Sequence, residues 1–201
     1  MTKEKNMSFW EHLDEFRNRL LIVLGSIILG SLAGYSYSEE IIQILIAPSN
    51  QLNISFQVIT VTSMFMIKLF VCFFTGLLVG FPILVYHLIK FTLPAFKIRL
   101  LGFTLLITAS SSLFFLGILF AYSIVIPFLL TFFTSISFES VDVKYNFTLG
   151  SYLNYSIWTM FINGLIFQMP VISAVGAKVG ILTPAFLSHY RRHSIIFFLI
   201  I

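Results

Sequence analysis

Long stretches without a charged residue are the strongest pattern in this sequence. They run over Leu20–Ser38, Leu69–Ile89, Leu100–Phe138 and Tyr145–Ala177, with lengths of 19, 21, 39 and 33 residues. Apolar residues are continuous along each stretch and do not alternate with polar ones, which favours helices over barrel strands. Because a helix needs roughly 20 apolar residues to cross a bilayer, each stretch predicts one span. The predicted fold is an all-α, polytopic helical membrane protein.

The expected spans cover about residues 20–38, 67–90, 100–127 and 151–177, within one transmembrane domain over residues 1–201. The third charge-free stretch is too short for two spans and a turn. We therefore expect one long helix that ends at Pro127, because a proline lacks the backbone donor that continues a helix. The fourth stretch predicts one helix that ends near Ala177 and contains Pro170.

The end of the chain predicts the beginning of a further span. Only eight residues, Ser194–Ile201, follow His193, and all but Ser194 are apolar. As a helix they would reach about 12 Å at ~1.5 Å per residue, less than half of a hydrocarbon core. We expect residues 193–201 to be a partial fifth span, which the intact protein completes and follows with a sixth.

The composition excludes a soluble domain. Hydrophobic residues make up 58% of the chain, including 24 phenylalanines, and charged residues only 10%, against about 25% in ordinary globular proteins. The net charge of +4 is carried by basic residues scattered at span ends, so it does not indicate a nucleic-acid partner. Cys72 is the only cysteine, which excludes a disulfide framework. We expect no metal and no cofactor.

The basic residues also predict the orientation in the membrane. With the N-terminus inside, the inner segments hold 10 of the 12 basic residues, namely Lys3, Lys5, Arg17, Arg19, Lys90, Lys97, Arg99, Lys178, Arg191 and Arg192. Lysine and arginine are enriched in cytoplasmic segments of membrane proteins. This bias predicts a cytoplasmic N-terminus.

Residues 1–19 predict an amphipathic segment at the inner membrane surface. Ser8 and Glu11 have the spacing of a capping box, which would begin a helix there. The apolar residues that follow have helical spacing and form one stripe of Phe9, Leu13, Phe16 and Leu20. We expect this stripe to lie flat on the interface before the chain turns into the first span.

The opposite face of this segment has two interpretations. It carries His12, Asp14, Glu15, Asn18 and Arg19. It could be a solvated face with Asp14–Arg17 and Glu15–Arg19 ion pairs, each contributing a few tenths of a kcal/mol. It could also be a binding surface. Charge pattern alone favours the first interpretation.

A family resemblance shifts that balance. The stretch Phe9–Leu20 resembles the His-Leu-x-Glu-Leu-Arg-x-Arg-Leu signature of the TatC family, the multi-spanning core of the twin-arginine protein translocase. Further matches follow in the family's order, at Ala47–Pro48, Met66–Leu69, Phe81–Tyr86, Gly117–Tyr122 with Pro127, Phe167–Val171, Gly180–Pro184 and Tyr190–Arg192. Each match is modest alone, but the ordered series covers almost the whole chain.

The resemblance implies a core component of the twin-arginine translocase. It would recognise paired-arginine signal peptides and help to move folded proteins across a membrane with the protonmotive force. It would not be an enzyme. Implied partners are single-span subunits of the TatA and TatB type, further copies of itself and the lipid bilayer. A bacterial inner membrane is the first expectation, with mitochondrial inner and thylakoid membranes as alternatives.

The resemblance also implies roles for individual residues. Glu15, Arg17, His12 and Asp14 would bind the signal peptide, since carboxylates accept bidentate hydrogen bonds from guanidinium groups. Gln168, Pro48 and Tyr122 would contact partners within or beside the spans.

The sequence departs from the family pattern in two places. The inner loop Leu93–Arg99 contains no acid, although the family usually has a glutamate there. Gln168 stands where the family usually has a glutamate, and it could anchor a partner helix or form an interhelical hydrogen bond that only stabilises packing. The competing function is a small-solute transporter or channel subunit, for which paired intramembrane charges would be expected.

Overall fold

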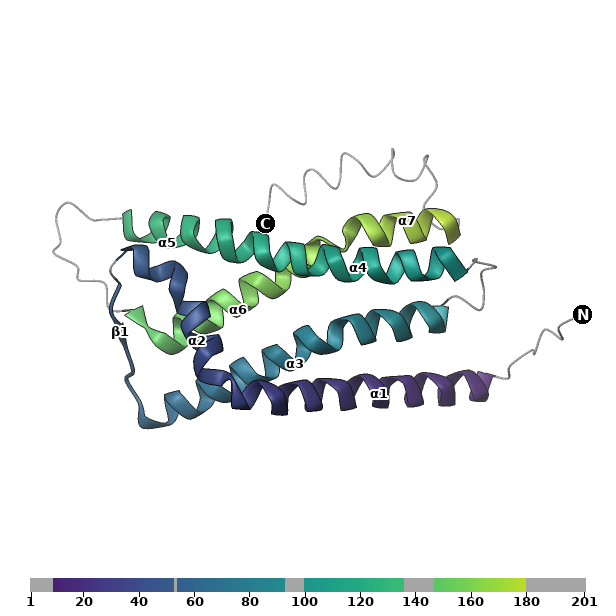
Figure 1. Ribbon diagram of the computed structural model, residues 1–201, viewed down its shortest axis with the longest axis horizontal. Coiled ribbons are helices and arrows are strands. Elements are labelled where there is room, and N and C mark those ends of the chain that lie inside the picture. The colour runs from purple at the N-terminus through teal and green to yellow at the C-terminus, as the bar shows by residue number, and fades with distance from the viewer. Residues whose placement is uncertain (1–8, 53, 93–99, 136–146, 180–201) are drawn as a thin grey trace, which may run out of the picture.

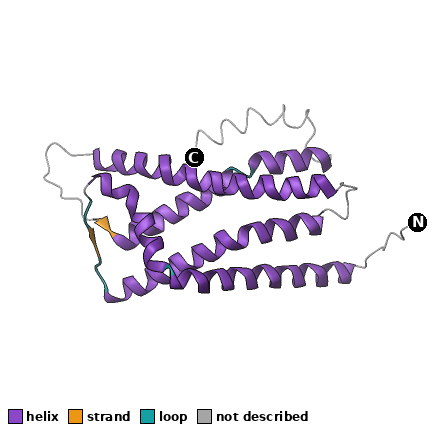
Figure 2. Ribbon diagram, in the orientation of Figure 1, coloured by secondary structure: helices purple, strands orange, loops and turns teal. Residues whose placement is uncertain are grey.

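The computed structural model describes residues 9–52, 54–92, 100–135 and 147–179, which form a bundle of long helices (Figure 1). The elements in chain order are α1 (Phe9–Ser36), α2 (Ser38–Ile46), the 3-10 helix η1 (Ala47–Leu52), β1 (Phe56–Gln57), α3 (Val61–Thr92), α4 (Leu100–Phe120), the π-helical segment η3 (Ala121–Val125), α5 (Ile126–Ser135), β2 (Phe147–Thr148), α6 (Leu149–Ile166) and α7 (Met169–Val179). Figure 2 shows that the described residues are mostly helical, with two short strands at one end of the bundle and short loops between elements. The predicted all-α fold is confirmed.

Four helical stretches in the described part of the chain are long and apolar enough to cross a membrane. They cover Trp10–Ser36, Val61–Phe91, Gly102–Ser135 and Leu149–Ala177, with 27, 31, 34 and 29 residues. Their outer faces carry many exposed large apolar side chains. So much exposed apolar surface is unfavourable in water but favourable in contact with lipid. The protein is an integral, multi-pass membrane protein with four spans in its described part.

The helix that contains the first span begins at Phe9, well before the apolar stretch. α1 is one helix of 28 residues, and it does not turn between the amphipathic segment and the apolar stretch. No glycine or proline occurs between Phe9 and Leu24 to bend it. The helix therefore runs unbroken from the polar residues of the first turns into the apolar stretch.

Two prolines do not act as expected. Helical structure continues through Pro127 to Ser135, and the π-helical segment η3 accommodates it, with the Ile126 amide donating to the Ala121 carbonyl five residues back. The fourth span is one crossing made of two helices, because α6 ends at Ile166 and α7 starts at Met169. Pro170 thus lies in the first turn of a new helix, where its missing amide hydrogen costs little.

Several sequence expectations fall outside the described residues. They are the Ser8 capping position, the inner loop Leu93–Arg99, the motifs over Gly180–Arg192 and the partial span 193–201.

α1 and α3 pack side by side along most of their length (Figure 1). Small residues permit the approach, since a Cβ atom on Gly76 would lie 2.1 Å from Ser31 Oγ and 2.4 Å from the Ile27 carbonyl oxygen. Ser31 Oγ is itself held by a 2.8 Å hydrogen bond to that carbonyl. This contact fixes the register between the two helices that form the candidate site.

The end of the bundle formed by α2, η1, β1 and β2 is called here the capped end. β1 and β2 pair in parallel through Phe56 with Phe147 and Gln57 with Thr148. The larger buried cluster lies beneath them and includes Leu45, Val71, Ala121, Ile126 and Leu153. Lys68 Nζ lies 2.9 Å from Glu39 Oε1, and this hydrogen bond holds the pKa of the Glu39 carboxyl below its ordinary value.

Candidate functional site

Charged side chains gather at the opposite end of the bundle, where α1 begins and α3 ends. On α1, Arg17 Nη2 lies 3.5 Å from Asp14 Oδ1, and both side chains are about two-thirds exposed, at 68% and 67%. Arg19 pairs with Glu15 one turn away, and these side chains are only 15% and 25% exposed. Both ion pairs predicted from helical spacing are confirmed. The Asp14–Arg17 pair is therefore exposed to solvent, whereas the Glu15–Arg19 pair is mostly shielded from it.

Aromatic contacts fix the position of α1 against the last turns of α3. The His12 ring stacks on Phe91, with centroids 4.2 Å apart and planes within 14°. Phe16 meets the same ring at 5.4 Å. Lys90 donates a 3.3 Å hydrogen bond to the Tyr86 hydroxyl and lies 5.5 Å from the centre of that ring. These contacts hold the start of α1 against the end of α3, and each of the two helices forms one wall of the space between them.

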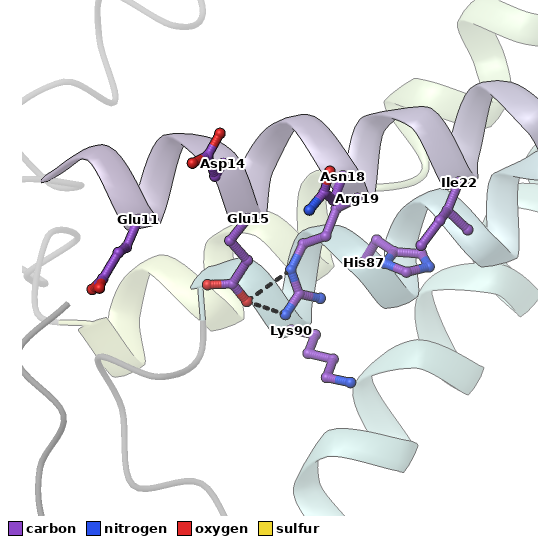
Figure 3. A pocket seen from close by; sticks show the side chains of 8 residues that line it. All are labelled: Glu11, Asp14, Glu15, Asn18, Arg19, Ile22, His87 and Lys90. Atoms are coloured by element: carbon purple, nitrogen blue, oxygen red, sulfur yellow. Dashed lines mark hydrogen bonds and ion pairs between the residues drawn. The ribbon is translucent and has the colours of Figure 1, made fainter. Parts of the chain in front are cut away.

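Between these walls lies an open cleft of about 550 Å³. Figure 3 shows its lining side chains, which come from α1 and from the last turns of α3. They are Glu11, Asp14, Glu15, Asn18, Arg19, Ile22, His87 and Lys90. We call this the charged cleft.

The charged cleft has an acidic wall and a basic one. α1 contributes three carboxylates and Arg19, and α3 contributes Lys90 and His87. Carboxylates in a partly enclosed cleft can accept charge-assisted hydrogen bonds from a guanidinium or an ammonium group. Within the described ranges, no three histidine, cysteine, aspartate or glutamate side chains are arranged to hold a metal ion. The cleft offers a ligand charged hydrogen-bonding groups of both signs.

The structure brings together only part of the predicted peptide-binding set. Glu15 and Asp14 line the charged cleft. His12 packs on Phe91 instead, and Arg17 pairs with Asp14 at the exposed surface. Sequence reasoning missed Glu11 and the α3 wall. Glu11 was findable, because it lies one helical turn before Glu15 and therefore on the same face.

Gln168 lies in the turn between α6 and α7 and is 7% exposed. Its Nε2 donates a 3.0 Å hydrogen bond to the Ser110 carbonyl oxygen, and its Oε1 accepts one from Ser110 Oγ. Both ends of the amide are therefore used inside this chain, between the fourth span and α4. Of the two alternatives, this geometry supports the interhelical packing role.

A neutral acid at this position would have nearly the same hydrogen-bonding capacity. We expect Gln168→Glu to change thermal stability little, because a carboxyl group in a span tends to stay protonated and can both donate and accept. Gln168→Leu should lower stability by about 0.6–2 kcal/mol, since it leaves Ser110 without its partner. Thermal unfolding in detergent measures both variants. Equal loss in the two would contradict the packing role.

Pro48 and Tyr122 act together at the capped end. Pro48 is buried in η1 and cannot donate the amide hydrogen that would bond the Ile44 carbonyl four residues back. The Tyr122 hydroxyl donates to that carbonyl at 2.8 Å, and the Tyr152 hydroxyl donates to the neighbouring Leu45 carbonyl at 2.9 Å. Both tyrosines thereby satisfy the end of α2 from other spans. The expected partner contacts of Pro48 and Tyr122 stay predictions.

The fold and the charged cleft define a class, the polytopic helical membrane protein with a cleft of charged side chains at one end of its bundle. The family model described as Sec-independent protein translocase protein (TatC) matches residues 11–201. This chain belongs to the TatC family. The resemblance that the sequence motifs indicated is confirmed.

Curated relatives from bacteria and chloroplasts agree. The TatC protein of Synechocystis sp. is 33% identical over 180 residues, covering 88% of this chain and 68% of that protein. TatCy of Bacillus subtilis is 30% identical over 200 residues, 99% of this chain and 78% of that protein. The chloroplastic TATC of Oryza sativa is 32% identical over 186 residues, which is 90% of this chain. The chain spans about half the length of the chloroplast relatives it matches.

A solved structure shares the fold. The crystal structure of the twin-arginine translocase receptor TatC superposes with a TM-score of 0.83 at 27% identity, covering 93% of this chain and 83% of that one. The arrangement of spans described above is therefore that of the TatC fold. The expected fold class and family are both confirmed.

Proposed function

We propose that this chain is the receptor component of a twin-arginine translocase, and that the charged cleft binds the paired arginines of a signal peptide. The observation that carries the proposal is the acidic wall of α1, where Glu11, Asp14 and Glu15 line one cleft. A guanidinium group presents a planar fork of donors that matches a carboxylate, which makes acids at a partly sheltered site its best receptors. Glu15 is the best placed of the three, because its side chain is only 25% exposed.

The wider role follows from the family. We propose that the protein helps to move folded cargo across a membrane with the protonmotive force, together with single-span subunits of the TatA and TatB type and further copies of itself. It would work without a cofactor and without enzymatic activity. The charged cleft would face the cytoplasm of a bacterial cell, with the N-terminus inside, where a signal peptide arrives. The alternative of a small-solute transporter finds no support among the relatives above.

Site-specific photocrosslinking tests this assignment. Asn18 lines the charged cleft and carries no charge, so a photoreactive benzoylphenylalanine there should report on cleft occupancy without removing an acid. A matched control replaces Tyr37, which follows α1 at the capped end and is 64% exposed. An arginine-pair signal peptide should crosslink from position 18 and not from position 37. Crosslinking of equal yield from both positions would reject the cleft as the binding site.

A further inference from the structure

Glu15 is already occupied by a guanidinium group from its own helix. Arg19 Nε donates a 3.0 Å hydrogen bond to Glu15 Oε1, and Arg19 Nη2 donates to the same oxygen (Figure 3). Among the described residues, no hydrogen bond involves the other oxygen, Oε2. Arg19 therefore holds one oxygen of the Glu15 carboxylate, and the residue as a whole lines the cleft.

This pair differs from the other ion pair on the same helix. Arg19 is 15% exposed, whereas Arg17 is 68% exposed and holds Asp14 at 3.5 Å. Exposed pairs are screened by water and exchange their partners at little cost. A sheltered guanidinium with two donors on one oxygen is harder to displace, because charge-assisted bonds strengthen as water is excluded. The two arginines are thus unequal competitors for their acids.

Lys90 adds to the competition from the α3 wall. It lines the same cleft, so the lining holds three carboxylates against two permanent cations. An arriving cation therefore meets little excess negative charge, and attraction by charge alone is weak. The cleft can therefore distinguish a guanidinium group from an ammonium group mainly through the geometry of hydrogen bonding to Glu15.

We propose that Arg19 is a specificity-determining residue. Its guanidinium group prevents a lysine of the peptide from binding Glu15 but allows an arginine to bind there. A lysine ammonium is a compact point charge, and it cannot match the fork of donors with which Arg19 holds the carboxylate. An arriving arginine carries the same fork, so it can displace Arg19 or share the carboxylate through Oε2. Selectivity here arises from an internal competitor as well as from a favourable contact. The inference rests on the proposed function of the charged cleft.

Peptide binding to the full chain in lipid nanodiscs tests the proposal. The probes are two fluorescent signal peptides, identical except for an arginine pair or a lysine pair. Arg19→Gln should raise the affinity for the lysine peptide about tenfold and change that for the arginine peptide less, so the ratio of the two affinities falls. As a control, Lys68→Gln removes the same charge from the ion pair with Glu39 at the capped end, away from the charged cleft, and should leave the ratio unchanged. An unchanged ratio in Arg19→Gln would overturn the proposal. An arginine that only stabilises the helix through its ion pair would not affect the ratio of the two peptide affinities.

A second measurement on the unaltered protein guards against a misfolded variant. The side-chain Nε–H resonance of Arg19 in nitrogen-15 NMR should shift when the arginine peptide saturates the cleft, and should stay in place with the same concentration of lysine peptide. The same shift with both peptides, or none with either, overturns the proposal.

Glu15→Gln separates the two levels of the argument. If the arginine peptide binds that variant normally, the proposed function of the cleft fails. If binding requires Glu15 but the ratio of affinities is the same in Arg19→Gln and the unaltered protein, only the proposed role of Arg19 fails.

Discussion

Replacing Glu15 by glutamine is expected to weaken binding of an arginine-pair signal peptide by about 10- to 100-fold, corresponding to about 1.4–2.7 kcal/mol for a lost hydrogen bond to a charged group. Glutamine keeps the shape of the side chain and can still accept from Arg19, so the cleft should keep its form. The negative charge that balances an arriving guanidinium is lost. Binding is measured with a fluorescent signal peptide and the full chain in nanodiscs.

Two further variants make this result specific. Asp14→Asn should have a smaller effect, because Asp14 and its partner Arg17 are about two-thirds exposed and water screens their charges. Glu40→Gln changes the same charge in α2, at the capped end, and should leave binding unaltered. If Glu15→Gln and Glu40→Gln gave equal losses, the effect would be one of net charge and the cleft would not be the receptor.

Replacing Gly76 by alanine is expected to lower stability by about 1–3 kcal/mol, the usual cost of overpacking a tight contact. The added Cβ would meet Ser31 Oγ at 2.1 Å, the Ile27 carbonyl oxygen at 2.4 Å and the Ser31 amide nitrogen at 2.9 Å. Two of these are backbone atoms, which cannot turn away, so α1 must move off α3. The charged cleft lies between these same helices, and peptide binding should weaken too.

The chain offers a matched control for this variant. A Cβ atom on Gly25, which lies in α1, would have nothing within 4 Å. Gly25→Ala should therefore be neutral or stabilising, because alanine has the higher helix propensity. Thermal unfolding in detergent compares the two variants. Equal melting temperatures for Gly76→Ala and the unaltered protein would show that α1 and α3 do not depend on this close approach.

Much of the site on α1 was accessible from sequence. Residues three or four apart on a helix are neighbours, so the Asp14–Arg17 and Glu15–Arg19 pairs followed from spacing alone. The other wall of the cleft did not. His87 and Lys90 face Glu15 only because α1 and α3 pack in one register, which depends on Gly76 and on the stacking of His12 against Phe91.

The prolines show the same division between local and tertiary causes. A proline in a sequence marks a missing donor, and the sequence alone therefore predicted an end at Pro127. The helix continues because the π-helical segment η3 absorbs the defect. At Pro48 the Ile44 carbonyl accepts from the Ala47 amide and also, in place of the missing Pro48 donor, from the hydroxyl of Tyr122, a residue far along the chain. The sequence shows where a backbone hydrogen-bond donor is missing, whereas the tertiary structure determines how the chain compensates for it.

The sequence by itself determined the membrane class, the four spans and the family, because continuous apolar stretches between charges have one stable solution in a bilayer. It also placed Glu15 and Asp14 on one helix. Only the tertiary structure decided that His87 and Lys90 of α3 face the Glu15–Arg19 pair across a cleft, and that the Gln168 amide forms its hydrogen bonds with Ser110. Those contacts depend on how helices approach one another, and side-chain packing between distant segments leaves no periodic trace in the sequence.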